Sequence, residues 1–325
     1  MARQIRYDAW SPGDGTLRRV DGAHTRWTSP WCAPGFAFAD LVPSWSATTA
    51  RGAWIEVSVQ ARGSRRWHAL GTWSSGTHRS HRSSPQGDPE VDTDVWRPTG
   101  APDGYRLRVL LVGDGARLHR VGAVVSAGRV RATTSTPLRR VTRVLDVPRL
   151  SQMTWQEVGG RGWCSPTSVA MVLSHAGTLP PATDIPRAAR EVFDPPYDGT
   201  GNWPFNTAWA AGLAGNAFVT RLHDLRDAER FVDAGIPLVA SVAYPPGALS
   251  GAPTHGTDGH LLVVRGFTAS GDVVTNDPAA PSERSVRRTY DRGQLERAWL
   301  RGSGGTVYVV HRDDQPLPRG GRGAW

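Results

Sequence analysis

Residues 162–177 read GWCSPTSVAMVLSHAG, and this stretch decides how the second half of the chain folds. Its apolar residues recur at positions i, i+3, i+4 and i+7, which is the spacing of one face of an α-helix. The residues that follow this spacing are Val169, Val172, Leu173 and Ala176. We therefore predict a helix over Pro166 to Ala176, with Ser165 as its N-cap and Gly177 as its C-terminal stop.

Cys164 stands directly before this predicted helix. A helix start presents free N–H groups and partial positive charge, and both stabilise a thiolate. Such a thiolate can attack a carbonyl carbon when a histidine takes its proton. The flanking Gly162 and Trp163 suit a tight turn and the wall of a cleft. A buried structural cysteine is the alternative, because most lone cysteines have that role.

A histidine and a carboxylate follow in the second half. The run Leu261 to Val264 is apolar on both faces, which predicts a central strand, and His260 opens it. A titratable side chain in that place needs partners, because its burial otherwise costs free energy. The strand, a turn and a return strand form a predicted hairpin, which brings Asn276 and Asp277 back beside His260. Either could orient the imidazole, as the third member of a catalytic triad does.

An amide donor is the fourth candidate group. Gln152 and Gln156 both lie upstream of Cys164. A glutamine amide can stabilise an oxyanion together with the backbone N–H of the nucleophile. The residues alone leave open which of the two has this role, and an ordinary surface glutamine is the alternative for each.

Outward from these blocks, the chain divides into three predicted segments. Residues 1–140 contain short alternating strands and turn signals, which predict an all-β, sandwich-like domain. Residues 141–312 combine helices with strands in an α+β pattern. The strand predictions that matter below are 54–59, 105–112, 121–125, 237–244, 260–267, 272–275 and 306–311, and a second helix is predicted over 224–234. Residues 313–325 are rich in Gly, Pro and Arg, and we expect them to be disordered.

The second segment resembles the C39-like cysteine peptidases, which are papain-like enzymes. The resemblance covers residues 145–312. It rests on VPRLSQ at 147–152, GWCSPTSVAMVL at 162–173, GHLLVVRGF at 259–267 and NDPA at 276–279. It implies a papain-like α+β peptidase domain that follows the all-β domain. Residues 1–140 look like the β-rich extension that precedes such domains in some actinobacterial proteins, with a role that the resemblance does not supply.

The resemblance also implies roles for four residues. In that family the glutamine serves the oxyanion hole, the cysteine is the nucleophile, the histidine is the base and the aspartate before proline orients the histidine. Carried over, these are Gln152, Cys164, His260 and Asp277. The sequence departs from the family at Ser165, where the exporter members usually have glycine, and in a longer spacing between the glutamine and the cysteine. No ATP-binding cassette follows, so exporter function is not implied.

Aromatic residues indicate where a substrate would bind. The turn-rich segment Asp194 to Asn206 contains Asn202 and Trp203, and we expect both to line the cleft together with Trp163. In the β-rich segment, stacking platforms for a glycan or peptide could come from Trp27, Trp31, Trp45, Trp54, Trp67 and Trp73. Core positions are the alternative for these tryptophans.

Composition excludes several classes of function. The net charge is +9, but all 38 basic residues are arginine and they are scattered, so we predict no nucleic-acid partner. The two cysteines, Cys32 and Cys164, form neither a disulfide framework nor a zinc motif, and we predict no metal. No apolar run is long enough for a membrane span. Met1 to Trp10 contains no signal-peptide core, which leaves a secreted or cell-envelope location open beside a cytoplasmic one.

Together these features predict a cysteine peptidase that hydrolyses peptide bonds through an acyl-enzyme. It needs no cofactor and acts on a peptide or protein. Two alternatives stay open. One is a non-catalytic papain-like protein that binds a glycan or peptide, with glycan contact by the N-terminal domain. The other is amidase or transglutaminase-type acyl transfer on the same three side chains, which the fold alone does not separate from hydrolysis.

Overall fold

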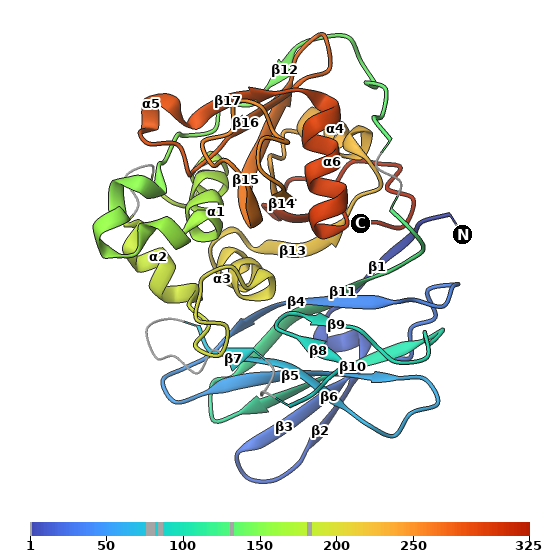
Figure 1. The fold of residues 1–325 in the computed structure, drawn as a ribbon. Helices are drawn as coiled ribbons and strands as arrows, with labels where there is room; N and C mark the ends of the chain where they lie inside the picture. The colour runs from blue at the N-terminus through green and yellow to red at the C-terminus, as the bar shows by residue number, and fades with distance from the viewer. Residues whose placement is uncertain (1, 76–81, 84–86, 131–132, 181–183) are drawn as a thin grey trace.

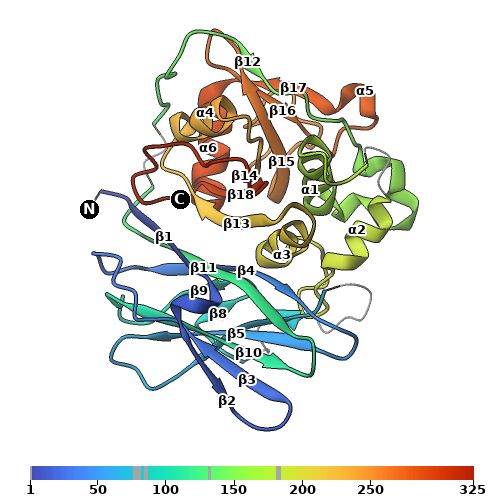
Figure 2. The ribbon, with the colours of Figure 1, turned by 180° about the vertical axis from the view of Figure 1, so that it is seen from behind.

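The computed structural model describes residues 2–75, 82–83, 87–130, 133–180 and 184–325. A β-rich part comes first in the chain, and a part that mixes helices and strands follows it. The two parts are stacked, and both ends of the chain lie near the junction between them (Figures 1 and 2). No helix among the described residues is long and apolar enough to cross a membrane.

Two antiparallel sheets build the β-rich part. The first contains, in spatial order, β1 (Gln4–Trp10), β11 (Arg117–Ala127), β4 (Asp40–Thr48), β9 (Val95–Trp96) and β8 (Val91–Asp92). The second contains β2 (Thr16–Arg19), β3 (His24–Thr28), β10 (Tyr105–Val112), β5 (Trp54–Ala61), β6 (His68–Trp73) and β7 (Arg82–Ser83). Side chains from both sheets form one shared apolar core.

This core accounts for half of the tryptophans that the sequence offers as stacking platforms. Trp27, Trp45 and Trp73 are buried within it, so none of these three presents a free ring face. Trp31 is 42% exposed, but the Arg106 guanidinium lies over its ring at 4.6 Å.

One antiparallel sheet forms the centre of the mixed part. Its order is β13 (Asn216–Arg221), β18 (Thr306–His311), β14 (Leu238–Tyr244), β15 (Thr257–Phe267), β16 (Val273–Asn276) and β17 (Arg287–Tyr290), and β12 (Arg143–Val144) pairs with β15. The helices are α1 (Cys164–His175), α2 (Ile185–Val192), α3 (Trp203–Ala214), α4 (Leu225–Asp233), α5 (Glu283–Val286) and α6 (Arg292–Ser303). Helices α1, α2 and α3 lie on one side of the sheet, and α4 and α6 lie on the other (Figure 1).

The periodic segments occur close to where the sequence predicts them. The strands predicted over 105–112 and 306–311 have those bounds in the structure. Helix α1, however, begins at Cys164 and not at Pro166, so the prediction of Ser165 as N-cap is wrong. Ser165 lies in the first turn, fully buried, and its hydroxyl is 3.0 Å from the hydroxyl of Tyr308.

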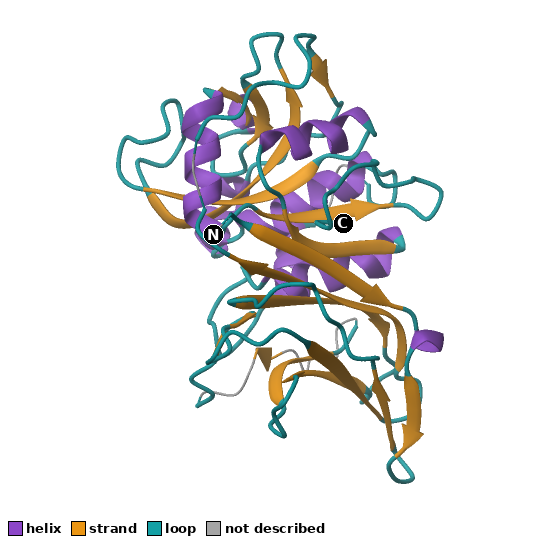
Figure 3. Ribbon diagram, turned by 90° about the vertical axis from the view of Figure 1, so that its right-hand side faces the viewer, coloured by secondary structure: helices purple, strands orange, loops and turns teal. Residues whose placement is uncertain are grey.

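Helix α3 was not predicted, because it has no polar face. Its sequence, WPFNTAWAAGLA, is apolar almost all round. The structure explains this pattern, because α3 is wedged between the β-rich part and the mixed part, next to β4 (Figures 1 and 3). Phe205 at its start enters the core of the β-rich part, with its ring 6.1 Å from that of Trp45 and 5.6 Å from that of Trp73.

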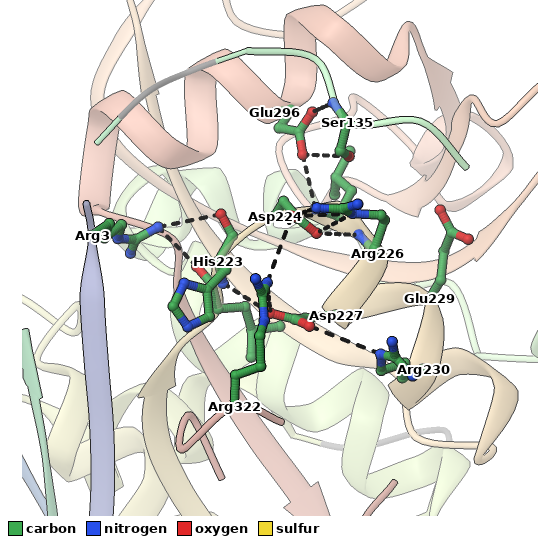
Figure 4. A network of polar contacts seen from close by, with 12 residues as sticks. Arg3, Ser135, His223, Asp224, Arg226, Asp227, Glu229, Arg230, Glu296 and Arg322 are labelled. Carbon is green, nitrogen blue, oxygen red and sulfur yellow. Dashed lines mark hydrogen bonds and ion pairs between the residues drawn. The ribbon is translucent and has the colours of Figure 1, made fainter. Parts of the chain in front are cut away.

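Polar contacts also join distant segments at the junction. Arg221 of β13 pairs with Asp40 of β4, and Ser135 donates from its backbone and hydroxyl to the buried Glu296 of α6, at 2.6 and 2.7 Å. Arg322, near the end of the chain, lies within 4 Å of Asp224 and Asp227 at the start of α4 (Figure 4). The two bonds of Ser135 therefore fasten the segment between the two parts to α6.

The last residues have contacts that their composition does not predict. The Trp325 ring lies 4.6 Å from the ring of Phe231, and Ala324 is fully buried. The backbone N–H of Tyr7 in β1 donates to the carbonyl of Gly323 at 2.6 Å. The C-terminal segment thus packs against both α4 and the first strand.

We predict that Phe205→Ala lowers the free energy of unfolding by about 3–5 kcal/mol, because it opens a cavity where α3 enters the β-rich core. Chemical denaturation measures the change. The matched control is Leu213→Ala, which truncates a side chain of the same helix that is 40% exposed. Equal losses in the two variants would contradict the placement of Phe205.

Candidate active site

One cavity of about 700 Å³ holds the groups that the sequence singles out. Its walls include Gln152, Cys164 and His260. Further lining comes from the loop before α3, from β14 and from the β8–β9 hairpin of the β-rich part. The cavity therefore lies where the two parts meet, and it also reaches the end of α6 at Gly302 and Ser303.

Cys164 is the first residue of α1, and no acidic residue lies in the first turn of that helix. Burial by itself raises the pKa of the thiol. The interaction with His260 and a hydrogen bond from the backbone of Leu261 outweigh burial, so the pKa of Cys164 falls below the ordinary thiol value. A thiolate is thus favoured at this position by the imidazole and by the free N–H groups of the helix start.

His260 is held by a buried carboxylate. Its Nε2 lies 2.8 Å from Oδ1 of Asp277, and the two residues are 4% and 0% exposed. Burial lowers the pKa of His260, but the charge and hydrogen bond of Asp277 raise it further than burial lowers it. Because Nε2 is engaged with Asp277, Nδ1 is the ring nitrogen left to exchange a proton with Cys164.

Asp277 in turn has two further hydrogen bonds. The Tyr290 hydroxyl donates to its Oδ2 at 2.8 Å, and the backbone N–H of Ala279 donates to its Oδ1 at 3.1 Å. Burial raises the pKa of Asp277, but the interactions with His260 and Tyr290 lower it below the usual aspartate value. A charged Asp277 is stable inside the protein because each of its oxygens has a donor.

Asn276 has a different role from Asp277. Its side chain donates to the carbonyls of Val147 and Pro148, at 3.2 and 2.9 Å, and accepts from Arg265 at 3.1 Å. Neighbouring residues at the end of a strand point to opposite faces, so only one of the pair reaches His260. The structure brings Asp277 to the imidazole and uses Asn276 to hold the segment before Gln152.

The two candidate glutamines are also placed differently. Gln152 is 2% exposed and lines the cavity, and its Nε2 donates to the carbonyl of Arg161 at 2.7 Å. Among the described residues, this amide nitrogen donates to the Arg161 carbonyl alone, so its second hydrogen is available to an oxygen atom that enters the cavity. Gln156 is exposed, lies outside the cavity lining and accepts a hydrogen bond from Arg161 at 3.0 Å.

Of the expected cleft residues, only Trp203 lines the cavity. Trp163 precedes α1 but is not part of the lining. Asn202 is buried, and it caps α3 by accepting from the N–H of Phe205 at 3.1 Å. Its amide also donates to Asp194 at 2.9 Å, and Asn202 is not among the residues that line this cavity. The residues just before it, Tyr197 to Gly201, do line the cavity.

Two groups at the site were missed by the sequence reasoning. Tyr290 lies in β17, beyond the predicted hairpin, and short edge strands leave little periodic signal. The β8–β9 hairpin has two strands of two residues each and belongs to the other part of the chain. Only the pairing of β16 with β17 and the stacking of the two parts reveal these contributions.

The second cysteine is unlike the first. Cys32 is a free thiol in the β-rich part, 3.2 Å from a carboxylate oxygen of Asp8. Burial and the negative charge of Asp8 raise the pKa of Cys32 to about 12. Cys32 is therefore a poor nucleophile at neutral pH. Cys164, by contrast, has both a helix start and a histidine to favour its thiolate.

Comparison with known proteins gives matches to both parts. The profile of the Peptidase_C39 like family matches residues 144–307, and that of the Peptidase C39 N-terminal domain matches residues 6–126. A crystal structure of a candidate C39-like peptidase from Bacillus anthracis is similar over 53% of this chain and 98% of that chain, with 20% identity and a TM-score of 0.39. No curated protein matches the chain.

We predict that iodoacetamide alkylates Cys164 well below the pH of about 8.5 at which an ordinary thiol ionises. In His260→Ala the effect of burial remains while the imidazole is lost, so the midpoint of the alkylation rate should move to higher pH. Both proteins carry Cys32→Ser, and rates are followed by mass spectrometry from pH 4 to 10. The control, His119→Ala, removes an exposed histidine of the β-rich part. An alkylation midpoint that is the same in the wild type and in His260→Ala would rule out a Cys164–His260 pair.

We predict that Tyr290→Phe raises the pKa of His260, because the Asp277 carboxylate that has lost its Oδ2 donor interacts more strongly with the imidazolium. The lost hydrogen bond should also lower the free energy of unfolding by about 1–3 kcal/mol. The pKa is read from the NMR titration of the His260 ring. Tyr244→Phe is the matched control, since it removes a buried hydroxyl that bonds Thr254 at 2.7 Å. It should cost stability and leave the His260 titration in place.

Proposed function

The chain belongs to the Peptidase_C39 like family, and we propose that it is a cysteine peptidase that hydrolyses peptide bonds through an acyl-enzyme at Cys164. The observation that carries this proposal is the arrangement around His260. One ring nitrogen is bonded to the buried Asp277, and the same imidazole lowers the pKa of a thiol at the start of a helix. The proposed nucleophile and base therefore line one cavity, and the orienting carboxylate is bonded to the base from inside the protein.

We further propose that the mixed part has a papain-like architecture. In support, the helix that begins with the nucleophile packs against the strand that carries the histidine. The hydroxyl of Ser168 in α1 donates to the carbonyl of Leu261 in β15 at 3.1 Å, which fixes the two elements close to the reacting groups.

The proposed reaction begins with the attack of the Cys164 thiolate on the carbonyl carbon of a peptide bond. A C–S bond forms, and the carbonyl oxygen becomes an oxyanion. The imidazolium of His260 then gives its Nδ1 proton to the leaving nitrogen as the C–N bond breaks. Asp277 stays ionised and keeps the imidazole in the orientation that this transfer requires.

Two hydrogen-bond donors stabilise the oxyanion in this proposal. The backbone N–H of Cys164 stands at the start of α1, where the helix itself supplies no acceptor for it. Among the described residues the Nε2 of Gln152 donates only to the carbonyl of Arg161, so its second hydrogen is the other donor. Gln152 is fixed because it bonds Arg161 and is almost fully buried. A donor held in place before the reaction stabilises developing charge without a cost of reorganisation at that moment.

Hydrolysis of the acyl-enzyme restores the starting state. His260 takes a proton from a water molecule, the hydroxide attacks the thioester carbon, and the C–S bond breaks to release the acid product and the Cys164 thiolate. His260 carries out both proton transfers in this sequence, so the proposed mechanism needs no cofactor. Its substrate is a peptide or protein that can enter the cavity.

We predict that Cys164→Ala abolishes peptide hydrolysis while the thermal unfolding of the protein is retained. The assay digests a mixture of denatured proteins and detects new chain ends by mass spectrometry. New ends that persist in Cys164→Ala would refute the proposed nucleophile. Hydroxylamine trapping of the acyl group in the wild type separates hydrolysis from a purely binding role.

We predict that Gln152→Ala lowers kcat by about 10²–10³-fold with little change in KM, because its donor acts mainly on the oxyanion. Gln156→Ala is the matched control and should leave both constants close to those of the wild type. A larger loss in Gln156→Ala than in Gln152→Ala would assign the oxyanion donor to the other glutamine.

A further inference from the structure

The β8–β9 hairpin brings the β-rich part into the candidate active site. Residues 92–95 and Arg97 line the same cavity as Cys164 and His260. Thr93 forms the turn of the hairpin with a φ of +53°, which turns the chain sharply between the two short strands. The cavity wall opposite the mixed part is therefore supplied by residues that lie outside the 144–307 match.

Hydrogen bonds across the junction hold this wall in place. Oδ2 of Asp94 accepts from the N–H of Trp203, the first residue of α3, at 2.8 Å. Beside it, the N–H of Ser83 donates to Asp194 at 2.9 Å. Asp194 also accepts from Asn202, so the loop before α3 is tied to the β-rich part on both sides.

Asp94 is a buried carboxylate without a cationic partner. It is 8% exposed, and none of the described residues forms an ion pair with it. Its neighbour Asp92 differs, because it is largely exposed and pairs with Arg97 at 2.5 Å. Burial raises the pKa of Asp94 to about 7, although the N–H of Trp203 lowers it. A buried charge with so little compensation is unfavourable unless something else supplies a positive group.

Asp94 lines the same cavity as the proposed reacting groups, Cys164 and His260. After burial, the charges of Asp94 and Cys164 are the next causes that raise the pKa of the Tyr197 phenol. Tyr197 also lines the cavity, so carboxylate, phenol and nucleophile are near one another. A side chain with an apolar stem and a cationic head could lay its stem along Tyr197 and Trp203 and place its head at Asp94.

The net charge of the wall favours the same kind of ligand. Four aspartates and two arginines line the cavity: Asp92, Asp94, Asp198 and Asp258 against Arg97 and Arg161. Arg97 is matched by Asp92, whereas Arg161 keeps its charge because its partner Gln156 is neutral, so Asp94, Asp198 and Asp258 outnumber the one uncompensated arginine. The remaining field is negative, and a concave site concentrates such a field on its ligand.

We propose that Asp94, carried on the β8–β9 hairpin, forms a subsite that binds a lysine or arginine side chain of the peptide substrate. This inference rests on the proposed peptidase function, because it names the substrate class for that cavity. It also gives the β-rich part a role in specificity. The alternative is that Asp94 serves only to cap α3 and dock the two parts.

The test measures binding and needs no turnover. Cys164→Ala is titrated by calorimetry at pH 8 with acetylated, amidated alanine–glycine hexapeptides that carry one lysine at each position in turn. Matched peptides carry norleucine, which keeps the stem and lacks the charge. We expect a lysine at one position to bind about tenfold more tightly than norleucine, as one charge-assisted hydrogen bond allows.

Asp94→Asn, added to Cys164→Ala, keeps an acceptor for the N–H of Trp203 and removes the charge. It should abolish the preference for lysine and leave norleucine binding unchanged. Asp103→Asn makes the same charge change at an exposed site of the β-rich part, where the side chain is 71% exposed, and should keep the preference. Equal binding of the two peptide series, or a preference that survives Asp94→Asn, would overturn the inference and leave Asp94 as a cap.

A second measurement does not depend on the folding of Asp94→Asn. Carbodiimide activates a carboxylate, and the amine of a bound lysine peptide then forms an amide with it. Mass spectrometry should locate this bond at Asp94 in Cys164→Ala, and a bond confined to other aspartates would overturn the inference. Failure of the peptidase proposal looks different, since wild-type protein would then cleave nothing while the lysine preference persisted.

Discussion

The candidate site depends on one buried charge. Asp277 has no exposed surface, and it stays ionised because His260, Tyr290 and the backbone of Ala279 all donate to it. His260 and Tyr290 belong to β15 and β17, on either side of β16, and Ala279 lies in the turn after β16, so the order of these three strands assembles the shell around the carboxylate. The imidazole is oriented only as long as that shell is complete.

Local sequence signals predict the helix and strands that carry this site, but they do not predict all of the side chains that contact one another in it. Helical periodicity predicts the helix that follows the proposed nucleophile, and a continuous apolar run predicts the histidine strand of the hairpin. The choice between Asn276 and Asp277 needed the strand register, since adjacent residues differ in the face to which they point. Likewise, only the burial of Gln152 and the exposure of Gln156 separate two glutamines that are equivalent as residue types.

Sequence patterns do not predict the elements at the junction between the two parts, for a physical reason. Periodicity records an element that has one apolar and one polar side. Helix α3 is covered by the β-rich part on one side and by the mixed part on the other, so its sequence is apolar throughout. The β8–β9 hairpin is too short to alternate. Contacts between the two parts therefore had to be read from the structure.

The shared wall of the cavity has a consequence for how such chains diversify. Gln152, Cys164 and His260 lie within residues 144–307 and the β8–β9 hairpin lies before them, yet both line one cavity. Recombination that exchanges the segment before residue 144 would keep these side chains and replace part of the cavity wall. A lineage could in this way acquire new targets by shuffling whole segments, without point changes among the four reacting side chains.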